Sequence, residues 1–187
     1  MKVISYAAIK GKKTLIRGEV GKGKTVLLSR LLAEAAESEG PGAITVIEMA
    51  PGERSVEGRK VGGRLAIPAS TRVRIRYAAP GHIVAPRLEG ATAEEVVRLA
   101  KQNALAIEPC LSQYIAMPTP VLFANDITIY LQCGSAELLG EAVALAETFV
   151  GTAYWGDFFD DKGSGINDKE RRQLGKLMDL FDVVLDL

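Results

Sequence analysis

Histidine, cysteine and long apolar runs are all scarce in this sequence. His82 is the only histidine, so a Ser-His-Asp or Cys-His mechanism would depend on it alone, and a metal site with several histidines is excluded. The two cysteines, Cys110 and Cys133, form neither a CxxC pair nor a disulfide framework, which favours ordinary core residues in a reducing compartment. No apolar run approaches the roughly 20 residues of a membrane span, and residues 1–13 lack the pattern of a signal peptide. We therefore expect a cytoplasmic protein that does not contact a membrane.

The net charge is zero, but the charges are unevenly distributed along the chain. Residues 1–93 hold 16 Lys and Arg against 8 Asp and Glu, whereas residues 94–187 hold 7 against 15. The basic excess is sharpest in 54–87, where Glu57 is the only acid. Such a bias indicates an anionic ligand near the first half, although a solvated surface that pairs with the acidic half would account for it equally well.

Hydrophobic periodicity predicts alternating strands and helices along the whole chain. The strands are expected at 3–9, 13–17, 43–50, 71–77, 121–126, 148–156 and 182–187, with 127–133 continuing or pairing beside the strand before it. The helices are expected at 24–38, 92–116, 135–147 and 166–181. This alternation is typical of a three-layer α/β/α fold with a mainly parallel sheet. Because no repeat or linker interrupts it, we expect residues 1–187 to form a single domain.

Several local signals refine these predictions. Thr92 with Glu95 forms a capping box, Ser135 is a helix N-cap, and Pro109 is expected to kink or divide its helix. Gly40 is expected to end the helix at 24–38 in a left-handed conformation. Residues 51–70 show no sustained period, which in a folded domain is typical of a lid or binding loop.

The segment 18–25, GEVGKGKT, fits the pattern G-x-x-x-x-G-K-[ST] and lies between a predicted strand and a predicted helix. In such a loop a phosphate chain lies against backbone N–H groups, and the helix directs its positive end at the phosphates. Lys24 would neutralise the β- and γ-phosphates, and the hydroxyl of Thr25 would bind Mg²⁺. The predicted nucleotide-binding residues are Gly18, Glu19, Val20, Gly21, Lys22, Gly23, Lys24, Thr25 and Val26.

This segment resembles the P-loop NTPases. The resemblance implies that the domain binds ATP or GTP with Mg²⁺. It is close in the loop, and in the rest of the chain it extends only loosely to the α/β pattern. Glu19 stands where the septum-site ATPases carry an additional lysine, and Val26 stands where many relatives carry a second hydroxyl. A class that includes the signal-recognition GTPases and the dethiobiotin synthetases is one candidate subfamily.

The family also needs an acid at a strand end, and the sequence offers two. Asp126 closes the apolar run VLFAND, as the metal-binding acid of the family does. Glu48 lies in the first strand after the loop helix, where related proteins use an acid for metal binding or catalysis. The alternatives are a turn-forming Asn-Asp pair for Asp126 and a strand-end acid that caps a neighbouring loop for Glu48. The predicted catalytic residues are thus Lys24, Glu48 and Asp126, and the predicted metal ligands are Thr25, Asp126 and Glu48.

The basic segment 54–76 is the candidate surface for a protein partner or an anionic substrate. Arg54, Arg59 and Arg64 could close over a nucleotide. Arg72, Arg74 and Arg76 are predicted to form a solvated strand edge. Nucleic acid is not expected as a partner, because aromatic residues are not interleaved with the basic ones.

The sequence does not specify the base. It contains no [NT]KxD motif for guanine, and Thr152, Tyr154 and Trp155 are candidates for base contacts, with ordinary packing as the alternative. The favoured function is an NTPase that acts on the β–γ phosphoanhydride and drives a partner. A small-molecule kinase or ligase and a nucleotide-sensing module without turnover are the alternatives. A second copy of the chain is a further candidate partner.

Overall fold

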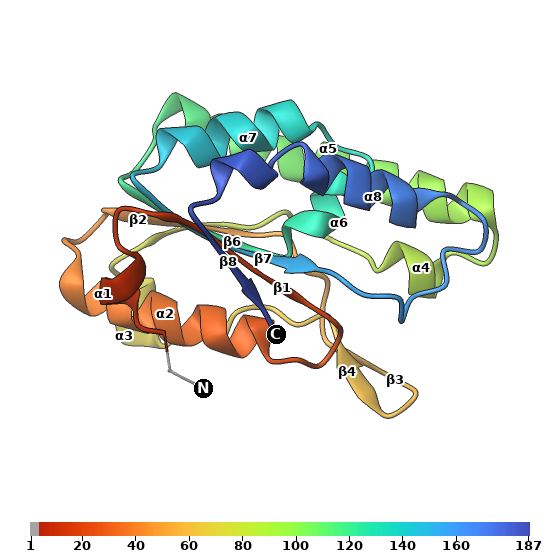
Figure 1. The fold of residues 1–187 in the computed structure, drawn as a ribbon, viewed down its shortest axis with the longest axis horizontal. Helices are drawn as coiled ribbons and strands as arrows, with labels where there is room; N and C mark the ends of the chain where they lie inside the picture. The colour runs from red at the N-terminus through yellow and green to blue at the C-terminus, as the bar shows by residue number, and fades with distance from the viewer. Residues whose placement is uncertain (1–3) are drawn as a thin grey trace.

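Six parallel strands form the central sheet of the computed structural model, which describes residues 4–187 (Figure 1). The order of the strands across the sheet is β5-β2-β6-β7-β1-β8, and every neighbouring pair is parallel. In chain order the strands are β1 (Lys13–Gly18), β2 (Ile44–Glu48), β5 (Arg76–Ala78), β6 (Val121–Asn125), β7 (Thr148–Tyr154) and β8 (Val183–Asp186). Because parallel strands place their carboxyl ends at one edge, β1, β2, β6 and β7 all end on the same side.

Helices cover both faces of the sheet, which confirms the predicted three-layer α/β/α architecture (Figure 1). One core lies between the sheet and α1 (Tyr6–Ile9) and α2 (Lys24–Ser38). The other lies between the sheet and α5 (Ala93–Ala116), α6 (Ile127–Leu131), α7 (Ala136–Leu145) and α8 (Ile166–Gly175). The remaining helical turns are α3 (Ala69–Arg72), α4 (Pro86–Glu89) and the 3-10 turn η1 (Met178–Leu180).

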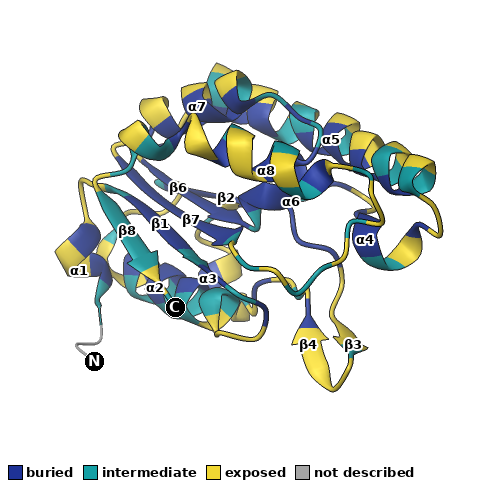
Figure 2. Ribbon diagram, turned by 45° about the vertical axis from the view of Figure 1, so that its right-hand side comes forward, coloured by how far each residue is buried: buried dark blue, intermediate teal, exposed yellow. Residues whose placement is uncertain are grey.

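The inner strands β2, β6 and β7 are buried on both faces, as expected for a parallel sheet between two helical layers, whereas the edge strands β5 and β8 are partly exposed (Figure 2). Successive side chains of β6 alternate between the two cores: Leu122 packs with α5 and α7, and Phe123 packs with α1 and α2. No helix of residues 4–187 is both long and apolar enough to span a lipid bilayer.

The predicted helix starts at Thr92 and Ser135 are confirmed. The Thr92 hydroxyl accepts the N–H of Glu95, and the Ser135 hydroxyl accepts the N–H of Leu138. Pro109 neither divides nor ends its helix, since α5 continues past it to Ala116.

Three strand predictions are wrong. Residue 3 of the expected strand 3–9 lies outside the described residues, but Tyr6–Ile9 is a helical turn that buries its first and last side chains. The expected strand 71–77 is divided between the end of α3 and the short edge strand β5. Residues 127–131 form α6, and all five side chains are buried; a helix enclosed on every side has no apolar stripe that a period could reveal.

The segment after β2 contains a hairpin, so 51–70 is not irregular throughout. Strands β3 (Arg54–Val56) and β4 (Arg59–Val61) pair antiparallel and project from the body of the protein (Figure 2). Glu57 and Gly58 connect them, both at positive φ (49° and 73°), which is the backbone of a type I′ turn. After α2, Glu39 is extended, and the left-handed glycine is Gly42 instead of Gly40.

Candidate functional site

The glycine-rich loop connects β1 to α2, and its backbone explains why glycine occurs there. Gly21 and Gly23 are left-handed, with φ of 74° and 84°, a region that other residues enter at a cost. At Gly18 a Cβ would lie 2.5 Å from the carbonyl oxygen of Leu187, so the close approach of β8 excludes any side chain. Helix α2 begins at Lys24, and its first N–H groups have no partner within the helix. The loop therefore presents backbone donors at the positive end of a long helix.

Lys24 turns back onto this loop. Its Nζ donates to the carbonyl oxygens of Gly18 and Glu19, at 2.8 Å each, and it forms no ion pair with any residue of 4–187. Burial lowers the pKa of Lys24, while the charges of Asp126 and Glu19 oppose that change. A half-buried ammonium held by neutral carbonyls is available to an anionic ligand.

Glu19 fixes the start of the loop to the segment after β7. Its carboxylate accepts the N–H groups of Val20 (2.8 Å) and Asp157 (3.0 Å). Burial acts to raise the pKa of Glu19, but these N–H donors outweigh it and the pKa is lowered overall. The Glu19 side chain thus connects the glycine-rich loop to the segment after β7.

Asp126 lies directly after β6 and is the N-cap residue of α6, in a left-handed conformation with φ of 57°. Its N–H donates to the hydroxyl of Thr152 (2.8 Å), and its Oδ1 accepts the hydroxyl of Thr128 (2.7 Å). Burial raises the pKa of Asp126, while Thr128, Lys24 and Arg87 act to lower it. A non-glycine residue held in this conformation is common at functional sites.

The glycine-rich loop and Asp126 line the same cavity, which has a volume of about 480 Å³. It lies at the carboxyl edge of the sheet and is lined by Lys24, Thr25 and Asp126. Of the predicted nucleotide-binding residues, 20–26 line it, whereas Gly18 and Glu19 do not. The volume is in the range of small-molecule sites, roughly 300–1,000 Å³.

Glu48 lies outside this cavity. It is 1% exposed, and its carboxylate accepts three hydrogen bonds, from the N–H of Ala50 (3.1 Å), the N–H of Leu65 (2.8 Å) and the amide of Asn125 (2.7 Å). Burial raises the pKa of Glu48 although these donors oppose it. The geometry matches the alternative of a strand-end acid that holds a neighbouring loop.

Asn125 is a site residue that sequence reasoning missed, and it contacts Thr152, which the sequence offers only as a candidate for base contacts. The Asn125 amide donates to Glu48 and to the carbonyl of Gly63 (3.1 Å), and its oxygen accepts the hydroxyl of Thr152 (3.0 Å). Since the same hydroxyl accepts from the backbone of Asp126, one chain of hydrogen bonds connects Glu48 to Asp126. The available signal was that a polar residue ends each of two neighbouring buried strands, Glu48 in β2 and Asn125 in β6.

The side chains of Thr25 and Asp126, which line the cavity, end in oxygen atoms, and oxygen is the ligand atom that Mg²⁺ prefers. Within residues 4–187 no group of three or more His, Cys, Asp or Glu side chains could hold a metal ion. A magnesium ion at this site would therefore need further oxygens from a phosphate chain and water, which is the usual way this ion is bound.

The predicted arginines are divided between the cavity and the surface. Arg64 lines the cavity. Arg54 pairs with Glu89 (2.9 Å), and Arg59 lies over the ring of Phe158, 4.9 Å from its centroid.

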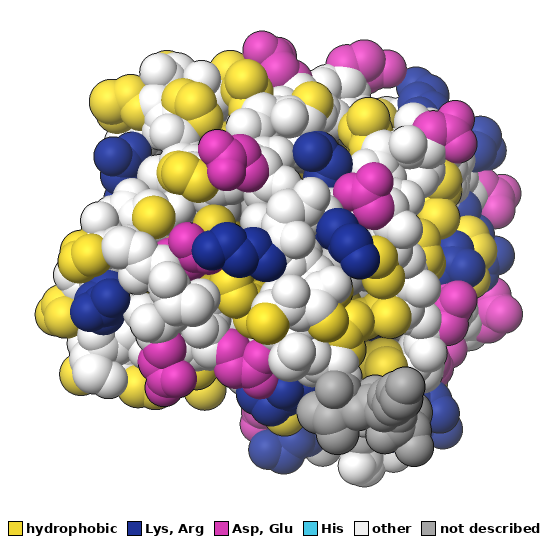
Figure 3. All heavy atoms as spheres, turned by 60° about the vertical axis from the view of Figure 1, so that its left-hand side comes forward, with side chains coloured by type: hydrophobic (Ala, Val, Ile, Leu, Met, Phe, Trp, Pro, Cys, Tyr) yellow, Lys and Arg dark blue, Asp and Glu magenta, His cyan; other side chains and the backbone are white. Residues whose placement is uncertain are grey.

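The arginines of 72–76 lie at the sheet edge. Arg72 stacks 3.5 Å from the Tyr77 centroid, and Arg74 and Arg76 each donate to a backbone carbonyl. On the face drawn in Figure 3, basic and acidic side chains are intermixed, so the basic excess of the first half forms no single patch there.

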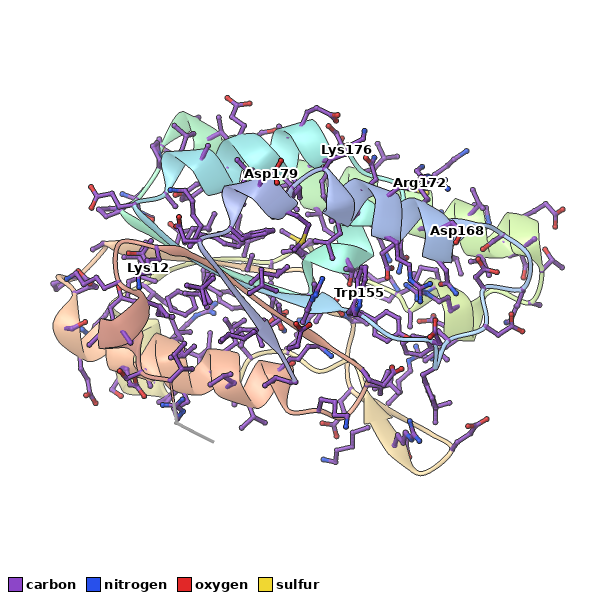
Figure 4. All side chains as sticks on the ribbon, viewed as in Figure 1. Lys12, Trp155, Asp168, Arg172, Lys176 and Asp179 are labelled. Carbon is purple, nitrogen blue, oxygen red and sulfur yellow. The ribbon has the colours of Figure 1, made fainter. Side chains whose placement is uncertain are left out.

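Two of the three candidates for base contacts line the cavity. Tyr154 and Thr152 do so, but Trp155 does not. Figure 4 shows Trp155 at the end of β7, below α8. It lies between the guanidinium groups of Arg17 and Arg171, at 4.8 and 5.8 Å from its ring.

Opposite the loop, the cavity is bounded by a buried polar cluster that sequence reasoning also missed. Arg87 of α4 pairs with Glu170 of α8, and the amide of Gln132 donates to the same Glu170 oxygen (3.1 Å). Arg87 and Gln132 line the cavity. Burial raises the pKa of Glu170 to about 7, although Arg87 opposes the change. No local pattern predicts a pair that is 83 residues apart in the sequence.

No family model matches this chain, and no curated protein matches it. Among solved structures, the Pif1 helicase from Candida albicans aligns with a TM-score of 0.40 and 15% sequence identity. The alignment covers 97% of this chain and 37% of the helicase, so the chain spans little more than a third of that protein's length. A likeness at this level does not identify a function, which has to come from the residues of the site.

Proposed function

We propose that this protein binds a purine nucleoside triphosphate with Mg²⁺ and hydrolyses its β–γ phosphoanhydride. The observation that carries the proposal is the position of Lys24. This half-buried ammonium has only carbonyl partners, lies where α2 begins, and shares a cavity with Asp126. That combination of free N–H groups, a cation and a carboxylate suits a triphosphate and little else of biological abundance.

In this proposal the loop and the first turn of α2 bind the phosphates through backbone N–H groups. Lys24 exchanges its two neutral carbonyl acceptors for charged phosphate oxygens, so each hydrogen bond to a dipole is replaced by one between opposite charges. Thr25 and Asp126 would hold the magnesium ion, which would supply positive charge beside the phosphate oxygens. We also assign to Asp126, which lines the same cavity, the orientation of the attacking water.

We assign Glu48 a positioning role in place of a metal-binding one. Three hydrogen-bond donors of the protein already occupy its carboxylate oxygens. Two of them are the backbone N–H groups of Ala50 and Leu65, before and after the hairpin. Glu48 would thus hold Gly63 and Arg64 against the cavity without contacting the nucleotide. The support for this choice is that Asp126 lines the cavity and Glu48 does not.

The test is a titration of fluorescent ATP and GTP analogues, with and without Mg²⁺, on the wild type, Lys24→Ala and Lys22→Ala. Lys22 lies in the same loop but is exposed, so its variant makes the same charge change without removing the inward ammonium. We expect Lys24→Ala to weaken binding at least a hundredfold and Lys22→Ala to weaken it by less than about fivefold. Equal effects would refute the assignment of Lys24.

Phosphate release from the preferred nucleotide, without any added substrate, tests the hydrolytic step. Release that is lost in Lys24→Ala supports an NTPase. Tight binding without release by the wild type would instead identify a nucleotide sensor or an enzyme that needs a second substrate.

A further inference from the structure

We propose that the β3–β4 hairpin is a lid on the cavity, that Arg54 and Arg59 form a latch which holds it shut, and that it opens to admit the nucleotide. The inference deepens the proposed function and rests on it for the identity of the ligand, but not for the movement. Its starting point is the position of the hairpin. Lys60 and Val61 line the cavity, and of residues 54–61 only Val61 is buried.

The two latch residues connect the hairpin to two other walls of the cavity. Arg54 pairs with Glu89 of α4 (2.9 Å), and the same carboxylate oxygen accepts the N–H of Ala85 (2.7 Å), which fixes it in place. Arg59 lies over the ring of Phe158, 4.9 Å from its centroid. Ala85 lines the cavity, and so does the residue after Phe158. The hairpin is thus attached both to α4 and to the segment after β7.

The base of the hairpin is fixed, but its strands are not part of the central sheet. Strands β3 and β4 pair only with each other among residues 4–187, and a lone two-stranded hairpin is at best marginally stable in water. Its legs meet where a Cβ on Gly62 would lie 2.9 Å from the carbonyl oxygen of Gly52. Just beyond, the N–H of Gly63 donates to the carbonyl of Pro51 (3.0 Å). These glycines, one on each leg, provide a hinge between the fixed base and the strands.

The latch is weak, as a lid that has to open requires. The side chains of Arg54 and Glu89 are 50% and 24% exposed. An ion pair or a cation–π contact at the surface changes an equilibrium by about threefold. Because both contacts hold one hairpin, losing them together should raise the population of the open state about tenfold. The burial of Val61 favours the closed state in addition, so the open state is the minor one.

The test measures access to the cavity without any ligand. Ala85→Cys places a thiol on the wall to which Arg54 is latched, at a position that is 8% exposed. The background carries Cys110→Ala and Cys133→Ala, so the introduced thiol is the only one. Its rate of reaction with N-ethylmaleimide reports how often the cavity opens. If Ala85→Cys does not fold, Leu88→Cys on the same wall replaces it.

The latch is then removed in this labelled protein. We expect the thiol to react about threefold faster in Arg54→Ala and in Arg59→Ala, and about tenfold faster in the double variant. The matched control is Lys60→Ala, which removes the same charge from the hairpin. The ion pair of Lys60 is with Glu53, at the base of the same hairpin (3.0 Å), so its loss should change the rate by less than about twofold.

Nucleotide kinetics on the arginine variants separate this proposal from the proposed function. The latch contacts do not involve the ligand, so their loss should raise the association and dissociation rates of the preferred fluorescent nucleotide about tenfold each and change Kd by less than about threefold. If no nucleotide binds but labelling is faster as expected, the proposed function fails and the lid remains.

Four results would overturn the lid. The first is a thiol that already reacts as fast as a free one when both arginines are present. The second is a double variant that is labelled no faster. The third is an equal acceleration by Lys60→Ala. The fourth is a nucleotide that binds and leaves the double variant at the rates measured with both arginines present.

Discussion

Replacing Glu170 by glutamine should change how the stability of the protein depends on pH. Glu170 is buried between Arg87 and Gln132, and burial raises its pKa from 4.5 to about 7 despite the neighbouring guanidinium. The folded protein therefore keeps a proton on Glu170 at pH values at which the unfolded chain has already lost it. Glutamine has a similar shape and cannot titrate, so Glu170→Gln removes this difference.

The sign follows from proton linkage. Between pH 4.5 and 7 the folded state binds more protons at this site than the unfolded state, so the free energy of unfolding of the wild type falls as the pH rises. A pKa difference between 4.5 and about 7 corresponds to about 3 kcal/mol at 1.36 kcal/mol per pKa unit. The value of about 7 already includes the attraction of Arg87 for the ionised carboxylate, so the loss of that ion pair in the variant is contained in this figure.

The assay is urea unfolding of both proteins at pH 4.5 and pH 8. The free energy of unfolding of Glu170→Gln, relative to the wild type, should rise by about 3 kcal/mol between the two pH values. Glu141→Gln, at an exposed position of α7, is the control and should show no such rise. If the free energy of unfolding of Glu170→Gln, relative to the wild type, changes by less than about 1 kcal/mol between the two pH values, Glu170 does not titrate as its burial implies.

Two further substitutions test the acids at the strand ends. Asp126→Asn should leave the fold intact and raise the Mg²⁺ concentration needed for nucleotide binding about tenfold, as measured by magnesium titration; an unchanged midpoint would remove Asp126 from the metal site. Glu48→Leu should destabilise the protein by about 3 kcal/mol or more in urea unfolding, because it leaves the donors on Ala50, Leu65 and Asn125 unpaired. It should also speed proteolysis at the β3–β4 hairpin, and a variant with wild-type stability would contradict the positioning role.

The parts of the site that depend on local sequence could be predicted. The spacing of Gly18, Gly23 and Lys24 defines a loop whose conformation depends mostly on its own residues, and α2 begins and ends where its periodicity indicated. The caps at Thr92 and Ser135 are local hydrogen bonds for the same reason. The position of Asp126 could also be predicted, because an acid that follows a buried strand lies at the carboxyl edge of a parallel sheet.

The parts that depend on distant residues could not be predicted. Nothing near Arg87 in the sequence indicates that Glu170 will neutralise it. Glu48 and Asp126 looked alike as strand-end acids, and only the fold shows that the loop after β2 surrounds one of them and leaves the other at the cavity. Helix α6 was missed because burial on all sides removes the polar positions from which a helical period is recognised.

The strand order explains why the two acids differ. Strand β7 lies between β1 and β6, so its residue Thr152 stands between the loop and Asp126. Its hydroxyl accepts the Asp126 N–H and donates to Asn125, which passes the connection on to Glu48 at the next strand. The carboxylate of Asp126, after β6, accepts a hydrogen bond from one hydroxyl, that of Thr128. The carboxylate of Glu48, at the end of β2, accepts three hydrogen bonds that occupy both of its oxygens. Free coordination capacity, more than position at a strand end, is what makes Asp126 the candidate metal ligand.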